Sequence, residues 1–269
     1  MVDKMPTPNP IAFTAFGIDV RWYGIMIAIG IVLATSIVYK RAPKHEIDPD
    51  RTLDFILICI PLGIVGARLY YVIFNWHYYA GDFFKIINLR AGGLAIHGGL
   101  LFGLAAAAIL CKLWSYRPLN ILDLTMPAVA LAQSIGRWGN YFNSEAHGGP
   151  TNLPWGIMVD GQRVHPTFLY ESIWCFLLFF VLIAIDNNRR FEGQTFLAYG
   201  ILYSIERFFV ESLRTDSLML FGVLRQAMVL SAVVFVICLV LYIILFMRAQ
   251  RHGKLFHSRY SKYTGKFKQ

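Results

Sequence analysis

The chain has 269 residues, of which 57% are hydrophobic and only 15% are charged, and its mean hydropathy is +0.52. An ordinary soluble domain of this size carries about 25% charged residues, so the composition excludes that class. The formal net charge of +9 comes partly from a basic C-terminal tail at about 248–269 that has no nucleic-acid-binding motif. We therefore expect a membrane surface, and no nucleic acid, as its partner.

Seven apolar runs follow one another along the chain, each near the ~20 residues that a helix needs to cross a bilayer. They lie at Trp22–Tyr39, Leu53–Phe74, Leu94–Trp114, Ile121–Ile135, Phe168–Ile185, Thr195–Val210 and Val223–Met247. The fourth and sixth are short and carry polar residues. The sequence predicts an all-α, polytopic integral membrane protein with about seven transmembrane helices, forming a single transmembrane domain over residues 1–269.

Basic residues predict which connections face the cytoplasm. Alternate connections hold Lys40, Arg41, Lys44 and Arg51, then Lys112 with Arg117, then Arg189 with Arg190, and finally the tail. By the positive-inside rule these segments are cytoplasmic. We expect the N-terminus outside, the C-terminus inside, and the loop region at about 140–167 on the outer face.

Polar side chains within the spans indicate function, because they are expensive to place in lipid. With the expected orientation, Asp54 and Asp123 lie at the cytoplasmic edges only. The others lie in the outer half of the membrane or at its interface, and they are Tyr23, Arg68, His97, Arg137, Tyr170, Glu171, Arg207 and Glu211. A channel or transporter needs polar groups in both halves or at the midplane. A non-catalytic scaffold does not explain so many at one depth, and Ser134 lacks the glycine-flanked setting of an intramembrane protease.

Two arginines suggest a phosphate site. Arg137 and Arg207 exceed what the nearby carboxylates need, and a pair at headgroup depth can grip a phosphate through bidentate hydrogen bonds. Arg207, Glu211 and Arg214 share one helical face through their spacing of i, i+4 and i+7. For Glu211 an interhelical ion-pair ladder is an equal alternative. For Arg68 the alternative is snorkelling or pairing with a helix end.

His97 is the only histidine within a span, in the segment GGLAIHGGL. Its flanking glycines allow close approach of backbone or ligand, and it could act as a general base near neutral pH or be a packing residue. No His, Asp or Cys stands at metal-ligand spacing, so we expect no metal and no cofactor.

The segment GRWGNYFNSEAHGG, from Gly136 to Gly149, is interpreted as the end of the fourth span and the start of a glycine- and asparagine-rich loop. Asn140, Asn143 and Glu145 could bind hydroxyl groups of a polar headgroup. The alternative is an ordinary turn with a polar rim.

Six ordered motifs together carry a family resemblance. They are RWYG (21–24), GARLYYV (66–72), HGGL (97–100), GRWGN followed by SEAHG (136–148), HPTFLYE (165–171) and YSIERFFVESLR (203–214). They resemble the prolipoprotein diacylglyceryl transferases over most of the chain. The resemblance implies a multi-pass enzyme of the bacterial plasma (inner) membrane, with its active site toward the outer leaflet.

The resemblance also implies the reaction and its participants. The diacylglyceryl group of phosphatidylglycerol is transferred to the lipobox cysteine thiol of a prolipoprotein signal peptide, and glycerol phosphate leaves. By motif position, the implied catalytic residues are His97, Arg137, Arg207 and Tyr23, and the implied substrate-binding residues are Arg68, Asn140, Glu145, Gly148, Glu211 and Arg214. Membrane lipids are further partners, and we expect a monomer.

Two positions depart from the family pattern. His147 stands where members often have an aromatic residue before the glycine, and Glu206 replaces the usual apolar residue. We expect Glu206 to face away from the reactive layer, which is the layer of polar side chains in the outer half of the membrane. Within that layer, we expect Arg137 and Arg207 to hold the lipid phosphate and His97, with Tyr23 nearby, to assist formation of the thiolate.

Overall fold

The computed structural model describes residues 8–89, 92–215, 217, 219–220 and 224–251. The chain divides into two compact units, Met1–Ile37 with Leu122–Gln269, and Val38–Ile121. The expected single transmembrane domain stays a prediction. Most of the predicted basic tail, residues 252–269, lies outside the described residues, and so does the predicted start of the last span at Val223.

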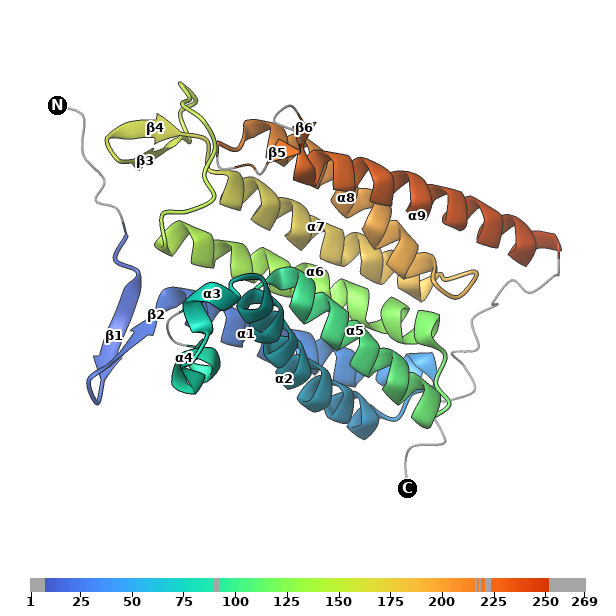
Figure 1. Cartoon of the computed structure of the whole chain (residues 1–269). Coiled ribbons are helices and arrows are strands. Elements are labelled where there is room, and N and C mark those ends of the chain that lie inside the picture. The colour runs from blue at the N-terminus through green and yellow to red at the C-terminus, as the bar shows by residue number, and fades with distance from the viewer. Residues whose placement is uncertain (1–7, 90–91, 216, 218, 221–223, 252–269) are drawn as a thin grey trace. The chain divides into compact units, whose positions relative to one another are not determined.

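Helices make up most of the described chain (Figure 1). The α-helices are α1 (Trp22–Arg41), α2 (Pro49–Phe74), α3 (Trp76–Tyr79), α4 (Phe83–Ile87), α5 (Ile96–Leu113), α6 (Pro118–Phe142), α7 (Thr167–Asn187), α8 (Gln194–Leu213) and α9 (Gln226–Arg251). A 3-10 helix, η1 (Ala42–His45), continues α1. Among the described residues, six helical segments are long and apolar enough to cross a membrane: α1 with η1, α2, α5, α6, α7 and α9. The predicted all-α, polytopic membrane fold is therefore confirmed.

Helix α8 is the remaining long helix, and its 20 residues also suffice to cross a bilayer. Three charged residues, Glu206, Arg207 and Glu211, lie in its second half. It packs between α7 and α9 in the first unit. The sequence run at Thr195–Val210 was identified correctly as a helix that carries polar groups.

Three antiparallel hairpins accompany the helices. They pair β1 (Ile11–Ala15) with β2 (Ile18–Arg21), β3 (Ile157–Val159) with β4 (Gln162–Val164), and β5 (Met219–Leu220) with β6 (Leu224–Arg225). Asp160 and Gly161 join β3 to β4 with positive φ angles of 49° and 80°, as an Asp-Gly hairpin turn requires. The β3–β4 hairpin lies in the second half of the predicted loop region between α6 and α7.

Glycines bring α2 and α5 into close contact in the unit Val38–Ile121. A Cβ atom on Gly98 would lie 2.3 Å from the carbonyl oxygen of Gly66, and one on Gly66 would lie 2.4 Å from Phe102. No other residue leaves room for this approach. The glycine after His97 therefore has the packing role that the sequence suggested.

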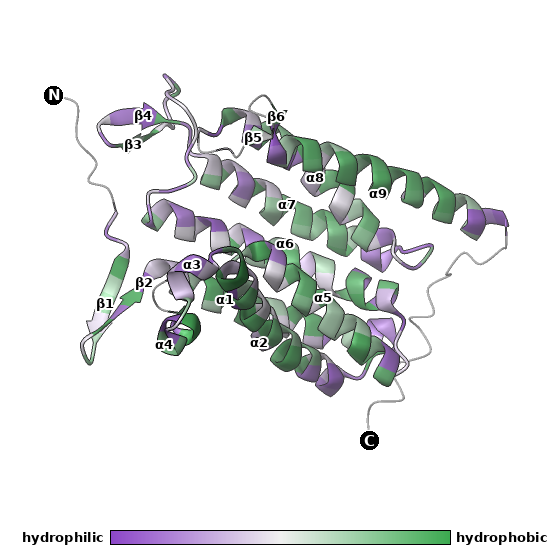
Figure 2. Ribbon diagram, viewed as in Figure 1, coloured by the Kyte–Doolittle hydropathy of each residue, from purple (hydrophilic) through white to green (hydrophobic). Residues whose placement is uncertain are grey.

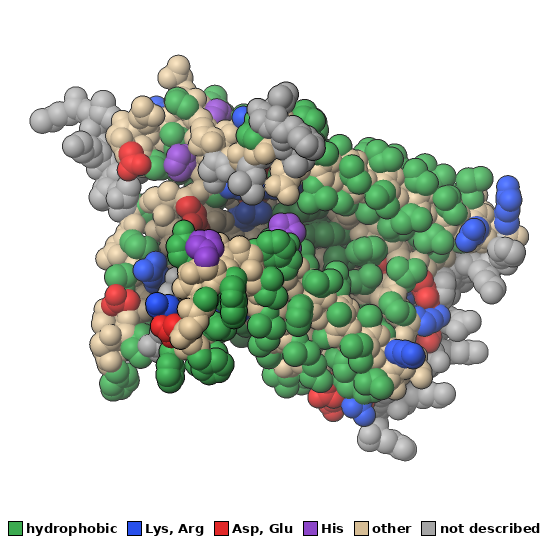
Figure 3. All heavy atoms as spheres, viewed as in Figure 1, with side chains coloured by type: hydrophobic (Ala, Val, Ile, Leu, Met, Phe, Trp, Pro, Cys, Tyr) green, Lys and Arg blue, Asp and Glu red, His purple; other side chains and the backbone are tan. Residues whose placement is uncertain are grey.

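In the larger unit, α6, α7 and α8 share a core of Ala130, Leu178, Leu182 and Ala198, while α8 and α9 meet at Leu197 and Cys238. Helix α9 is hydrophobic along nearly all of its length, with hydrophilic residues at its ends (Figure 2). Its apolar side chains cover its outer surface in the space-filling view (Figure 3), as a lipid-facing helix requires.

Helix α6 extends further than predicted. The expected span stopped at Ile135 and its loop began at Gly136, but the helix continues to Phe142. A Cβ atom on Gly139 would lie 2.4 Å from the ring of Tyr23, so this glycine serves helix packing rather than a turn. Trp22 stacks on Phe142 with ring centroids 5.0 Å apart. These contacts with the start of α1 support the additional two turns.

The N-terminus of α8 is capped by a side chain from α6. Its N-cap residue is Gly193, which has no side chain and a φ of 87°. Asp123 accepts hydrogen bonds from the backbone N–H groups of Gly193 (2.7 Å) and Phe196 (2.9 Å). Its Oδ2 also lies 2.9 Å from Nη1 of Arg189. This buried carboxylate therefore fixes the start of α8, the helix that carries Arg207, to α6.

Candidate active site

Glu171 on α7 joins two arginines from the neighbouring helices. Its Oε2 lies 2.7 Å from Nε of Arg137 on α6, and its Oε1 lies 2.5 Å from Nη1 of Arg207 on α8. The Glu171 side chain is 2% exposed, and the arginine side chains are 22% and 19% exposed. One buried carboxylate thus holds two guanidinium groups side by side, with part of each arginine still accessible.

Further groups on α8 complete this arrangement. Arg137 donates a hydrogen bond from Nη2 to the hydroxyl of Tyr203 (3.3 Å), and Nη2 of Arg207 lies 2.7 Å from Oε2 of Glu211. We call Arg137, Glu171, Tyr203, Arg207 and Glu211 the Glu171 cluster. Its members come from three helices whose contacts are made by the core beneath them.

Sequence reasoning grouped Glu171 with Arg137 and Arg207 but missed its role. The expectation that the two arginines exceed what the nearby carboxylates need stays a prediction, and the structure adds that both of them contact Glu171. The missed signal is that Tyr170 and Glu171 end the motif HPTFLYE, directly after the start of α7. A carboxylate in the first turns of a span is the natural partner for arginines at the same depth.

Glu206 also differs from the expectation that it faces away. The residue is 5% exposed, and neither of its carboxylate oxygens has a hydrogen-bond partner among the described residues. It lies close enough to Glu171, Arg137 and Arg207 to interact electrostatically with all three. Neighbouring positions on a helix point about 100° apart, so Glu206 and Arg207 can both face the interior of a three-helix contact.

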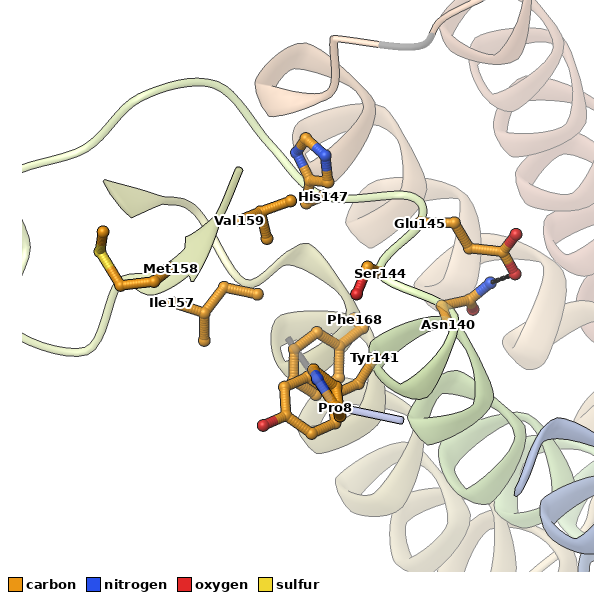
Figure 4. A pocket seen from close by; sticks show the side chains of 10 residues that line it. All are labelled: Pro8, Asn140, Tyr141, Ser144, Glu145, His147, Ile157, Met158, Val159 and Phe168. Carbon is orange, nitrogen blue, oxygen red and sulfur yellow. Dashed lines mark hydrogen bonds between the residues drawn. The ribbon is translucent and has the colours of Figure 1, made fainter. Parts of the chain in front are cut away.

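The loop after α6 is held in shape by Glu145. Its Oε1 accepts hydrogen bonds from the side-chain amides of Asn140 (3.0 Å) and Asn143 (3.2 Å). The structure thus brings together two of the predicted substrate-binding residues, Asn140 and Glu145. A small pocket beside them is lined by Pro8, Asn140, Tyr141, Ser144, Glu145, His147, Ile157, Met158, Val159 and Phe168. In Figure 4 the apolar side chains of β3 lie on one side of it and the Asn140–Glu145 pair on the other.

Gly148 connects this loop to the end of α8. Its backbone forms an antiparallel bridge with Arg214, and its N–H donates to the carbonyl of His165 (2.9 Å). A Cβ atom there would lie 2.7 Å from Cβ of His165. Nε of Arg214 lies 4.0 Å from Oε2 of Glu211. Gly148, Glu211 and Arg214 therefore link the loop to the Glu171 cluster, which is a structural connection that the sequence did not reveal.

Tyr23 is placed by Gly139. Its ring packs against this glycine near the end of α6, and the residue is 36% exposed. Gly139 lies between Arg137 and Asn140 in the chain, so the first turn of α1 lies beside the part of α6 that carries two of the predicted site residues.

The other predicted residues, Arg68 and His97, belong to the unit Val38–Ile121. Arg68 is 4% exposed and donates to four backbone carbonyls, those of Lys85 (2.6 Å), Ile86 (2.8 Å), Gly92 (2.6 Å) and Gly93 (3.0 Å). Its guanidinium also lies over the ring of Tyr79. These bonds use most of its five N–H donors, and those to Lys85 and Ile86 support the alternative of pairing with a helix end, here the end of α4. Its assignment to substrate binding stays a prediction.

His97 is the second residue of α5, at the start of the span as predicted. Its ring centroid lies 6.2 Å from that of Tyr70 on α2. The close contact of Gly98 with Gly66 fixes the backbone at this point. Its assignment as a general base stays a prediction. In the described part of the chain, no group of three or more His, Cys, Asp or Glu residues could hold a metal ion.

Known proteins resemble this chain over most of its length. Residues 10–244 match the family described as prolipoprotein diacylglyceryl transferase. A protein of this name from Clostridioides difficile, phosphatidylglycerol–prolipoprotein diacylglyceryl transferase, is 55% identical over 223 residues, covering 83% of this chain and 90% of its own. Equivalently named proteins of Finegoldia magna and Clostridium novyi are 48% and 47% identical, and each comparison covers 87% of this chain.

Proposed function

Because the chain belongs to the prolipoprotein diacylglyceryl transferase family, we propose that the Glu171 cluster binds the phosphate of phosphatidylglycerol. The protein is a transferase that moves the diacylglyceryl group of this lipid to the cysteine thiol of a prolipoprotein, which forms a thioether and releases glycerol phosphate. The geometry of the two arginines is the observation that supports the proposed site.

Glu171 orients both arginines and leaves some of their N–H donors unused. Arg137 uses Nε and Nη2 in its contacts, and Arg207 uses Nη1 and Nη2. A guanidinium group has five N–H donors, so each keeps donors for a ligand. Two arginines held in place by one carboxylate can grip a phosphate through planar, paired hydrogen bonds, at no cost in ordering when the lipid arrives.

The transfer reaction requires both an activated thiol and a stabilised leaving group. A thiol with a pKa of about 8.5 must lose its proton to become nucleophilic, and a phosphate ester leaves slowly unless its developing charge is neutralised. Sulfur attacks the glycerol carbon, the carbon–oxygen bond breaks, and the phosphate takes the electron pair. Arg137 and Arg207 stabilise the departing phosphate, Asn140 and Glu145 orient the headgroup hydroxyls, and His97, with Tyr23, assists removal of the thiol proton.

The site faces the outer leaflet of the bacterial inner membrane in this proposal. The basic connections support that orientation through the positive-inside rule. A cysteine introduced at the exposed residue Asn152, in a background without the four native cysteines, should react with a membrane-impermeant reagent in intact cells. Labelling only after the membrane has been opened would reverse the orientation.

Arginine-to-lysine variants test the phosphate site, because lysine keeps the charge but loses the planar fork. Arg137→Lys and Arg207→Lys should each cost about 2–4 kcal/mol of transition-state stabilisation, which is roughly a 30- to 1000-fold slower reaction. The double variant should be impaired far less than the product of the two effects, since both groups act on one phosphate. Arg51→Lys, at a half-exposed ion pair with Asp54, is the matched control.

The assay incubates purified protein with phosphatidylglycerol and a lipobox peptide and detects the diacylglyceryl-modified cysteine by mass. Rates are compared for variants with unchanged thermal stability. If both lysine variants turn over at rates near that of Arg51→Lys, the arginines are not a phosphate clamp and the proposed site must be abandoned.

A further inference from the structure

Glu206 is a buried carboxyl group for which the proposed reaction has no use. It lies on α8, one residue before Arg207, and is 5% exposed. Both of its carboxylate oxygens lack a hydrogen-bond donor among the described residues. By contrast, both oxygens of Glu171 are bonded to arginine. An ionised carboxylate without donors is costly to bury, so the surroundings of Glu206 favour its uncharged form.

The charged and titratable groups around Glu206 come from α6, α7 and α8 itself. Arg137 on α6, Glu171 on α7 and Arg207 on α8 interact with it electrostatically, and the thiol of Cys175 on α7 is also in range. Helix α9 has no charged residue between Gln226 and Met247. Both arginines already contact Glu171, and Arg207 also contacts Glu211, so neither is a dedicated partner for Glu206.

We propose that Glu206 must be uncharged for phosphatidylglycerol to bind, because its ionised form competes with the lipid phosphate for Arg137 and Arg207. When Glu206 is protonated, Arg137 and Arg207 face only the carboxylates that already contact them, Glu171 and Glu211, and their remaining N–H donors are available to the phosphate. When Glu206 loses its proton to solvent, a third buried carboxylate, after Glu171 and Glu211, lies close to the same arginines. Glu206 is thus a residue that sets the charge of the site. The inference rests on the proposed phosphate-binding role of the two arginines.

The proposal predicts a pH dependence of lipid binding that belongs to one side chain. A group that favours binding in its protonated form supports binding at low pH, and this support is lost as the pH rises through its titration. Equilibrium binding of a short-chain phosphatidylglycerol to purified protein in neutral detergent is measured from roughly pH 6 to pH 9, where buried glutamates can titrate. Zwitterionic phosphatidylcholine of the same chain length is the control lipid.

In the wild-type protein, affinity for phosphatidylglycerol should fall on the order of tenfold across this range, the change that 1.36 kcal/mol produces. Glu206→Gln mimics the protonated form and should bind as the wild type does at low pH, with less than about a twofold change on raising the pH. Glu206→Met, which keeps the length of the side chain without its charge, should show the same flat profile. Glu46→Gln, at an exposed position in the other unit, should keep the wild-type profile.

Three results would overturn the inference. These are a wild-type profile in Glu206→Gln and Glu206→Met, a flat profile in the wild type, or weak binding at every pH in folded variants, which would mean that the carboxylate is needed in its charged form. Binding by Arg137→Lys and Arg207→Lys separates this inference from the proposed function. If the lysine variants bind weakly while Glu206→Gln follows the wild-type pH profile, the phosphate site stands and only the role of Glu206 fails.

Discussion

Asp123 offers a direct test of how α8 is held in place. Replacing it with asparagine preserves its shape and removes its charge. In the structure Oδ1 accepts from the N–H of Phe196, while Oδ2 accepts from Gly193 and pairs with Arg189. An asparagine has one oxygen, so its NH₂ group must point at N–H donors on one side or the other. Either orientation breaks at least one bond at the start of α8.

The expected loss can be estimated from the burial of the pair. The Asp123 side chain is 0% exposed and that of Arg189 is 13% exposed. Breaking a buried ion pair by removing one partner costs about 3–5 kcal/mol, and the partial exposure of Arg189 favours the lower end. We therefore expect Asp123→Asn to lower the free energy of unfolding by about 3 kcal/mol.

Unfolding in mixed micelles of mild detergent and dodecyl sulfate, followed by tryptophan fluorescence, measures this loss. Asp54→Asn is the matched control, because Asp54 pairs with Arg51 at 3.3 Å with both side chains about half exposed. Exposed pairs contribute less than about 1 kcal/mol. If the two variants are destabilised equally, the cap supplied by α6 does not anchor α8, and the account of how Arg207 is positioned must be revised.

Other predictions concern single positions. Gly139→Ala should destabilise the protein by about 1–3 kcal/mol through overpacking, whereas Gly136→Ala, with no atom within 4 Å of its added Cβ, should be neutral or stabilising by up to about 1 kcal/mol in thermal unfolding. His97→Ala should slow transfer by about 10²–10⁴-fold with normal expression, and wild-type turnover would remove it from the mechanism. The backbone N–H of Lys85 lowers the pKa of Asp82, so the cap on α4 should persist above the ordinary aspartate pKa of about 3.9 and fail as the pH falls through the lowered value. Hydrogen exchange in α4 should show this acid sensitivity in the wild type but not in Asp82→Asn.

Much of the helical architecture is predictable from the sequence because lipid imposes a simple length rule on apolar runs. The run at Leu53–Phe74 ends at the observed end of α2 despite Pro61. The end of α6 was missed by seven residues, since the prediction stopped at Ile135 and the helix ends at Phe142. From the sequence alone, Gly139 indicated a turn. Only its contact with the ring of Tyr23, which comes from a distant part of the chain, explains it as a packing residue.

The candidate site was predicted less completely than the fold. Depth in the membrane is a one-dimensional property, so Arg137, Glu171 and Arg207 could be assigned to one layer from topology alone. Which carboxylate contacts which arginine depends on helix rotation, and neither the bridging role of Glu171 nor the burial of Glu206 follows from spacing. Family resemblance supplied the names of the residues but not these contacts.

The composition of α8 has a consequence for how the protein is made. A helix that brings Glu206, Arg207 and Glu211 into the bilayer enters lipid poorly by itself. Two of the groups that make it compatible with lipid, Asp123 at its first turn and Glu171 beside Arg207, lie on α6 and α7. Both helices precede α8 in the chain and leave the ribosome before it. The order of synthesis therefore presents α8 with its ionic partners already in the membrane, and α8 should be retained there by its neighbours rather than by its own hydrophobicity.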